Sequence, residues 1–328
     1  EIMGKTCSDC DVLYSRSSFS RNQWLKEDRH SRCKDCVAES QSRNKKSSTS
    51  SRPPPPPTTT NHQSLIQSLS SLSCADVLSD EALFERPPPG EDCAICFLRL
   101  PGITEQTYNE CCGKMVCSGC IVADLDAHRS PPFPCAFCRI PAPMSGKECM
   151  FRLNKRIVAK DSMAFHQMGC FYNEGIMGLP LSCKRSMEYW LRAIEIGPAS
   201  SLGSTRAHCS IAEAYENGEG VVKDMDKAIH HYSLAAMGGN EQARFNLGAF
   251  YCNDGDNKRG MKHLMVGAKT GDDDSMKEVR RGFLSGHVTK DELADTVLAY
   301  NESNDEIKSE QRDIAAAEKA MRMAGGYY

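Results

Sequence analysis

Cysteines with paired spacing dominate the stretch between residues 93 and 138. Two thiolates separated by two residues at a turn can bind one tetrahedral zinc ion, at about 2.3 Å each. Eight thiolates therefore suffice for two closed four-ligand sites, and closed sites are structural rather than catalytic. A segment this short buries too little apolar surface to fold without such an ion. The eight residues are Cys93, Cys96, Cys111, Cys112, Cys117, Cys120, Cys135 and Cys138.

A second cysteine cluster lies near the start of the chain. Its spacing predicts one further four-cysteine zinc site, which brings the predicted total to three zinc ions. Residues 1–46 carry ten Lys and Arg against seven Asp and Glu. Phe19 and Trp24 therefore have two interpretations: they pack beneath the zinc, which we favour on grounds of size, or they stack on nucleic acid. The four ligands are Cys7, Cys10, Cys33 and Cys36.

Composition limits the environment of the chain. Twelve of the 18 cysteines fall in the two clusters, and this grouping fits zinc in a reducing compartment better than a disulfide framework. We therefore expect a cytoplasmic or nuclear protein. The net charge of −3 recruits neither nucleic acid nor membrane, and no apolar run is long enough to span a bilayer. The chain begins Glu1-Ile2-Met3, which is typical of a fragment of a longer protein.

The elements that must position the cysteines fall into five zones. Pro53 to Pro57 and Pro87 to Pro89 mark a Ser/Thr/Pro-rich segment that cannot bury a core. The predicted zones are a small zinc finger at 1–46, a disordered linker at 47–89, a zinc module at 90–146, a helical repeat domain at 150–300, and a C-terminal amphipathic helix with its tail at 301–328. We expect that last helix, Asp305 to Met323, to cover the final repeat.

The helical zone repeats itself. Residues 164–172, 207–215 and 243–251 align, each ending in tyrosine, with spacings of 43 and 36 residues between Tyr172, Tyr215 and Tyr251. Periods of this size with two helical stretches indicate a solenoid. The run Tyr215-Glu-Asn-Gly218-Glu-Gly220, followed by Ala228, closely resembles the Sel-one-like repeat, a relative of the tetratricopeptide repeat. That resemblance implies a right-handed superhelix whose concave face binds protein partners, and no catalysis.

The eight-cysteine module resembles a RING finger, with gaps of 14 residues between its first and second and its third and fourth cysteine groups. The resemblance implies a cross-brace in which the first and third pairs share one zinc and the second and fourth share the other. It also implies contacts to a ubiquitin-conjugating enzyme through Ile95, Leu125 and Arg139. Asp124 and Ala136 depart from the family pattern. Because Cys111 and Cys112 are adjacent, a half-filled second site, or one completed by another residue, stays open.

The N-terminal cluster is similar to the Stc-one-like zinc ribbon, carried by residues 18–24 and 32–36. Members of that family take part in the assembly of chromatin-silencing complexes.

The sequence thus predicts a mainly α protein, a Sel-one-like solenoid preceded by a RING-like cross-brace module and a small zinc finger. Our leading hypothesis is a ubiquitin ligase that positions a conjugating enzyme, has no catalytic residue of its own, and uses the solenoid to bind a substrate or partner. The alternative is a non-catalytic adaptor or scaffold, with a version associated with chromatin or nucleic acid.

Overall fold

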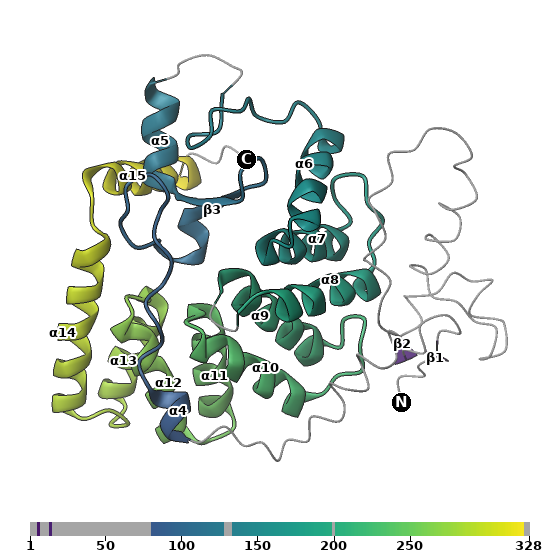
Figure 1. The fold of residues 1–328 in the computed structure, drawn as a ribbon. Coiled ribbons are helices and arrows are strands. Elements are labelled where there is room, and N and C mark those ends of the chain that lie inside the picture. Colours follow the sequence, from purple (N-terminus) through teal and green to yellow (C-terminus); the bar gives the residue numbers. More distant parts are fainter. Residues whose placement is uncertain (1–4, 7–12, 15–79, 128–132, 199–200, 325–328) are drawn as a thin grey trace.

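Antiparallel helices make up most of the computed structural model, which describes residues 5–6, 13–14, 80–127, 133–198 and 201–324. Figure 1 shows the helices stacked in chain order, with the cysteine-rich module lying between α6 and α15 at the top of the view. The stack contains α6 (Gly146–Val158), α7 (Ser162–Glu174), α8 (Cys183–Ile196), α9 (Leu202–Asn217), α10 (Met225–Met237), α11 (Glu241–Asn253), α12 (Asn257–Lys269) and α13 (Asp273–Leu284). The predicted mainly helical solenoid is confirmed.

The three aligned segments of the sequence are the first helices of three hairpins, α7–α8, α9–α10 and α11–α12. Ala164, Ala207 and Ala243 begin the aligned segments, and all three are fully buried. A methyl side chain at this position lets neighbouring helices approach closely, while Tyr172 and Tyr215 fill the space farther along.

Polar caps explain where these helices begin. The side chain before each helix from α6 to α13 accepts a hydrogen bond from a backbone N–H of the first turn, as Asp161 does from Met163 and Asn240 from Ala243. Gly218 ends α9 with φ +76°, and Gly220 follows with φ +73°. Both lie in the left-handed region that favours glycine, and they form the turn between α9 and α10.

The cysteine-rich module is built on one hairpin and one helix. Strands β3 (Gln106–Asn109) and β4 (Lys114–Cys117) pair antiparallel, with Gln106 opposite Cys117 and Asn109 opposite Lys114. A single-turn 3-10 helix, η3 (Ile103–Glu105), precedes them, and α5 (Ser118–Ala127) follows directly. Two further short strands, β1 (Lys5–Thr6) and β2 (Leu13–Tyr14), also pair antiparallel.

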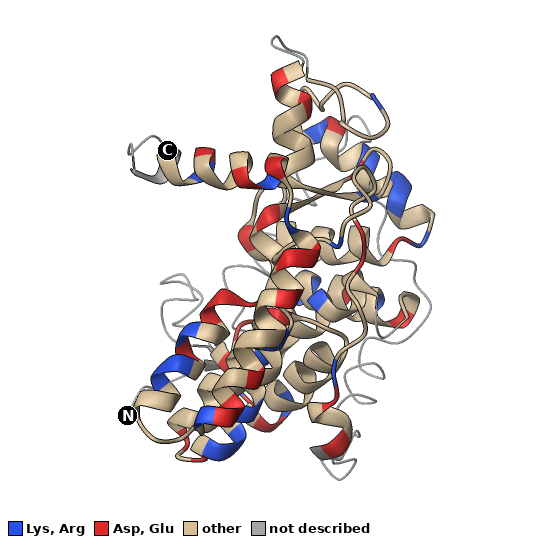
Figure 2. Ribbon diagram, turned by 90° about the vertical axis from the view of Figure 1, so that its left-hand side faces the viewer, with Lys and Arg blue, Asp and Glu red and all other residues tan. Residues whose placement is uncertain are grey.

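The C-terminal helices differ from our expectation. The predicted single helix Asp305 to Met323 is divided at Lys308, whose φ of −70° and ψ of 134° are extended, between α14 (Lys290–Ile307) and α15 (Glu310–Ala324). Instead of covering the final repeat, α15 returns to the cysteine-rich module and packs against α5 (Figure 1). Acidic residues outnumber basic ones along α14, which faces the viewer in Figure 2.

The end of the predicted disordered linker is also different. Residues Asp80–Phe84 form α4, which packs against α10 and α12. Leu83 is buried, and its carbonyl accepts a hydrogen bond of 2.6 Å from Arg244. The linker prediction is therefore wrong for this segment, because Leu83 is buried and Phe84 half-buried against the solenoid. Among the described residues, no helix combines the length and apolar character that a membrane span requires.

Candidate metal centres and partner-binding groove

The first group of thiols joins the knuckle Cys93–Cys96 to the end of β4 and the start of α5. Its four sulfur atoms, from Cys93, Cys96, Cys117 and Cys120, all lie within 4.8 Å of one another. The Cys93–Cys120 and Cys96–Cys117 sulfur pairs are 3.8 and 3.9 Å apart. Cys93 and Cys117 are buried together with Val116, so this group lies in the small core of the module.

The second group joins the tip of the β3–β4 hairpin to the knuckle Cys135–Cys138. Cys111, Cys112, Cys135 and Cys138 place their sulfur atoms within 4.8 Å of one another as well. The adjacent pair reaches this arrangement because the chain turns tightly there: the N–H groups of Cys112 and Gly113 both donate to the Asn109 carbonyl. Gly113 has φ +70°, which completes the turn.

The two knuckles are built alike. In each, the N–H of the residue after the second cysteine donates to the carbonyl of the first, at 3.0 Å for Phe97 and 2.9 Å for Arg139. Phe97 and Arg139 have φ values of +58° and +62°, unusual for residues with a side chain. The structure thus brings together, in each group, the cysteines that the cross-brace pattern assigns to one zinc.

The donor sets fit zinc. Four sulfur atoms at about 2.3 Å from a tetrahedral ion lie about 3.8 Å from one another. The recorded contacts between 3.4 and 4.0 Å bracket this value. Burial, followed by hydrogen bonds and charge from the neighbouring cysteines, raises the pKa of Cys111, and burial raises that of Cys112 to about 11. Thiols crowded in this way ionise together only beside a cation, which is what a bound zinc would supply.

Arg312 of α15 links the first group to the C-terminal helix. It is buried, and its guanidinium donates to the carbonyl oxygens of Arg99 and Ile307 at 2.8 Å. It also donates to the Cys96 sulfur at 3.5 Å. Nothing in the cysteine spacing pointed to this residue, which lies more than 200 positions farther along the chain.

The predicted contacts to a conjugating enzyme occupy three places. Ile95 is half-buried against the module core, whereas Leu125 on α5 is 37% exposed. Arg139 forms an ion pair with Asp124, the neighbour of Leu125, so its side chain lies over α5. Sequence reasoning noted Asp124 as a departure from the family but missed this pairing.

The N-terminal ligands Cys7, Cys10, Cys33 and Cys36 lie outside the described residues, and so do Phe19 and Trp24. Their zinc site stays a prediction.

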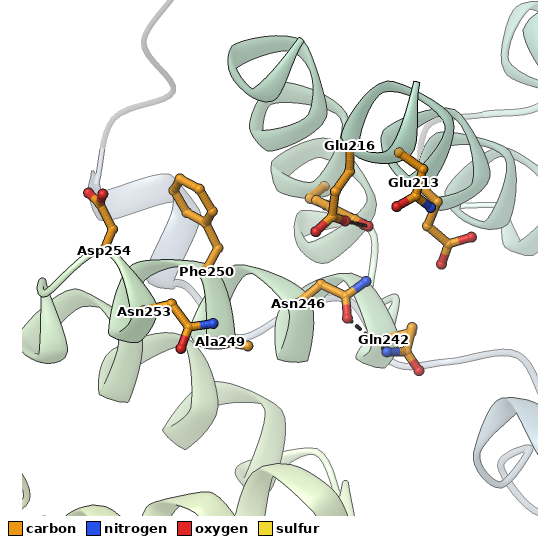
Figure 3. A pocket seen from close by; sticks show the side chains of 10 residues that line it. Glu213, Glu216, Gln242, Asn246, Ala249, Phe250, Asn253 and Asp254 are labelled. Carbon is orange, nitrogen blue, oxygen red and sulfur yellow. Dashed lines mark hydrogen bonds between the residues drawn. The ribbon is translucent and has the colours of Figure 1, made fainter. Parts of the chain in front are cut away.

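The solenoid contains a polar groove of about 630 Å³ between α9, α10 and α11 (Figure 3). Sequence reasoning missed it. The available signal was the polar spacing on α11, where Gln242, Asn246 and Asn253 fall on one helix face. The lining residues are Glu213, Glu216, Asn217, Tyr232, Gln242, Asn246, Ala249, Phe250, Asn253 and Asp254.

A histidine pair lies beside this region. The Nδ1 atoms of His208 and His231 are 2.9 Å apart, and both side chains are buried. Burial lowers the pKa of His208 to about 4 and that of His231 well below its usual value. Neutral rings packed in this way contribute to the core.

Comparison with known proteins identifies the repeat. The sequence pattern of the Sel1 repeat matches residues 162–198 and 205–240, which contain the hairpins α7–α8 and α9–α10. The chain is similar to chitin synthase regulatory factor 4 of Schizosaccharomyces pombe, with 27% identity over 148 residues; the match covers 45% of this chain and 22% of that protein. The chain thus spans about a fifth of the length of this curated relative.

Two solved structures are also similar. A Sel1 repeat protein from Oxalobacter formigenes has a TM-score of 0.42 and 19% identity, covering 56% of this chain and 71% of its own. A protective antigen present in uropathogenic Escherichia coli strains has a TM-score of 0.42 and 20% identity, covering 57% and 37%. Sel1 repeat proteins generally mediate protein–protein interaction. The helical half of the chain contains Sel1 repeats, as its sequence predicted.

Proposed function

We propose that this protein is a zinc-dependent RING-type ubiquitin ligase whose Sel1 solenoid binds the substrate or a partner. The observation that carries the proposal is the interleaved grouping of eight cysteines into two sets of four, each with the separation that zinc requires. Two zinc ions would be held here and a third by the N-terminal finger. Clustered reduced cysteines support a cytoplasmic or nuclear location.

In this proposal the protein positions a reaction and does not carry it out. Bound zinc would supply folding free energy and fix the two knuckles. Ile95 and Leu125 would then present apolar contacts to a ubiquitin-conjugating enzyme, and Arg139 would contact the enzyme and its ubiquitin. Holding the loaded thioester in one conformation accelerates its discharge, because the entropy of orientation is already lost.

Arg139 has a left-handed backbone, as Phe97 has at the equivalent position of the first knuckle. A residue with a β-carbon costs on the order of 1 kcal/mol in this conformation relative to glycine. Arginine at φ +62° is therefore destabilising for the turn itself. What distinguishes Arg139 from Phe97 is the guanidinium, which is paired with Asp124.

Ubiquitin discharge from a panel of conjugating enzymes tests the proposal, with metal content measured on the same sample. We expect discharge by the zinc-loaded protein, and about a tenfold loss for Ile95→Ala. Val222→Ala, which truncates an exposed aliphatic side chain on the solenoid, is the matched control. Because Ile95 packs partly on the module core, the zinc content of Ile95→Ala must equal that of the wild type for its loss to count.

The alternative is a non-catalytic adaptor. The ion pair between Asp124 and Arg139 favours this alternative, because an arginine paired with Asp124 is not available to contact a conjugating enzyme. Zinc-loaded protein that discharges no conjugating enzyme would support this alternative. Its nucleic-acid version rests on the basic residues of segment 1–46. Full-length protein should then bind DNA or RNA with an affinity that falls as salt rises, and Arg16→Glu with Arg21→Glu should weaken binding. Absence of binding at low salt would remove this version.

A further inference from the structure

The polar groove of the solenoid has a strong excess of negative groups. Three carboxylates line it, on Glu213, Glu216 and Asp254, and no lysine or arginine is among the described residues that form its wall. Figure 3 shows Glu216 reaching from α9 toward the helix that carries Gln242 and Asn246. The Glu216 carboxylate accepts a hydrogen bond of 2.6 Å from the Tyr232 hydroxyl, which fixes its direction.

The position of Glu213 makes its charge costly without a ligand. Part of its side chain is exposed to solvent. The surrounding protein nevertheless partly desolvates its carboxyl, and this desolvation raises the pKa of that carboxyl. A hydrogen bond from the Cys209 thiol lowers this pKa in part, and the neighbouring carboxylate of Glu216 raises it. A cation entering the groove would relieve both of the effects that raise this pKa, since an opposite charge within a few ångströms favours the ionised form.

The side-chain amides on α11 indicate that the cationic group belongs to a peptide. Gln242, Asn246 and Asn253 are spaced by four and seven residues and line one wall, and the Gln242 Nε2 donates to the Asn246 Oδ1 at 2.9 Å. Side-chain amides offer donors and acceptors together, which match the N–H and C=O groups of a peptide backbone. A helical ligand already satisfies those groups internally, whereas an extended one does not.

Phe250 adds an aromatic ring to the lining, whereas Tyr232 is almost fully buried and contributes its hydroxyl, which holds Glu216. Aromatic faces accept the aliphatic stem and the charged end of lysine or arginine. Carboxylates, amides and an aromatic ring thus occur together in one groove, and each meets a different part of the same kind of ligand.

We propose that this groove binds an extended segment of a partner protein that carries lysine or arginine side chains. The proposal rests on the partner-binding part of the proposed function and is independent of its ligase part.

Fluorescence anisotropy with the full-length, zinc-loaded protein tests the proposal. The probe is a labelled peptide of about eight residues alternating arginine and alanine, whose extended length of about 26 Å exceeds that of the groove wall formed by about three turns of helix. We expect saturable binding that weakens as salt rises, and no binding of the same peptide with glutamate in place of arginine.

Variants localise the binding. Glu213→Gln combined with Glu216→Gln should weaken it about tenfold, and Asn246→Ala about fivefold. Glu302→Gln removes an exposed carboxylate from α14 and should leave the affinity unchanged. An N-methylated peptide with the same side chains should bind wild-type protein several-fold more weakly, because methylation removes its backbone donors; this arm needs no protein variant.

Equal weakening by Glu302→Gln and by the groove variants would overturn the proposal, since binding would then reflect overall charge. If the N-methylated and unmethylated peptides bound with equal affinity, the proposed hydrogen bonds between the α11 amides and the peptide backbone would be wrong. If the protein self-associates and the groove variants abolish that self-association, the occupant of the groove would be a second copy of this chain, and the proposal of a partner segment would be wrong. None of these results depends on ubiquitin, so failure here is distinguishable from failure of the ligase proposal.

Discussion

The ion pair between Arg139 and Asp124 sets the charge presented by the cysteine-rich module. The Asp124 side chain is only 12% exposed, whereas that of Arg139 is 57% exposed, so the carboxylate is fixed and the guanidinium reaches over it. If Arg139 acts on a conjugating enzyme, it must leave this partner first. Breaking the ion pair would therefore cost free energy and lower the ligase activity.

Asp124→Asn should raise ubiquitin discharge about twofold to fivefold, because an ion pair with one exposed partner is worth about 0.5 to 1 kcal/mol. Arg139→Ala should lower it. Discharge rates for both variants, at equal zinc content, check this. Equal rates for wild type and Asp124→Asn would show that the pair does not restrain Arg139.

Cys111 and Cys112 are adjacent, and removing one of the two thiols tests whether both bind zinc. Cys112→Ser should lower the zinc content by about one ion per chain and reduce the melting temperature of the module, because three thiolates hold the ion more weakly than four. Cys170→Ser changes a half-buried cysteine of α7 outside both groups and should lose no zinc. Mass spectrometry under native conditions counts the ions. An unchanged count for Cys112→Ser would mean that Cys112 is no ligand.

Spacing along the chain predicted the paired thiols of each knuckle because a knuckle is local: two residues separate its thiols. Which pairs share a group was implied by the resemblance to a RING finger. The pairing of Asp124 with Arg139 was not predictable in this way. It depends on how α5 lies against the second knuckle, which no local pattern specifies. The grouping of Arg312 with Cys96 was missed for the same reason.

Among the elements, α15 has the least expected position. Gly119 of α5 lies so close to it that an added β-carbon would be 2.8 Å from the Arg312 backbone nitrogen. Close approach of two helices requires this absence of a side chain.

Gly119→Ala should displace α15 and destabilise its contact by about 1 to 3 kcal/mol. Hydrogen exchange of residues 310–321 measures the change, which should be faster in the variant. At Gly102, an added β-carbon would meet its nearest neighbour, a Glu241 oxygen, at 3.4 Å, so Gly102→Ala is the matched control. Unchanged exchange in Gly119→Ala would contradict the packing of α15 on α5.

The solenoid helices were predictable because several local signals agree: alanine positions recur with the repeat, and a cap precedes each helix. The helix α4 was not, since Leu83 and Phe84 stand beside Pro87 to Pro89 in a sequence that is otherwise polar. Its docking depends on Arg244 and on the ring of His263, whose centroid is 4.7 Å from that of Phe84. Those partners lie more than 150 residues away.

Taken whole, the molecule holds its cysteine-rich module from two sides. On one side the Tyr108 hydroxyl donates to the Asp161 carboxylate at 2.8 Å, and Arg156 donates to the same oxygen. On the other side α15 packs on α5. Glu241, at the start of α11, lies beside Gly102 of the module, so the interface also includes a titratable group.

Burial, with a contribution from Asp272, raises the pKa of Glu241 to about 7. A carboxyl with a raised folded-state pKa binds its proton more tightly in the folded state, so stability falls as pH rises from about 4.5 to 7. Glu241→Gln removes this dependence. The free energy of unfolding of the variant should exceed that of wild type by about 1 to 3 kcal/mol at pH 8, and the difference should shrink toward pH 5.

Urea unfolding of both proteins at pH 5 and pH 8 measures the difference, and Glu302→Gln serves as the control on α14. The comparison between variants cancels the protonation of thiols and buried histidines, which both proteins share. A difference independent of pH would contradict the raised pKa.

The attachment of the cysteine-rich module on two sides has a consequence for any client, meaning a protein bound by the solenoid. The separation between the groove on α9 to α11 and Arg139 on the second knuckle is then constant. Under the proposed activity, a lysine of the bound protein would be ubiquitylated when its distance from the segment in the groove matches this separation. The residues around that lysine would not matter. Selection by distance would let one ligase act on clients that share only a short basic stretch.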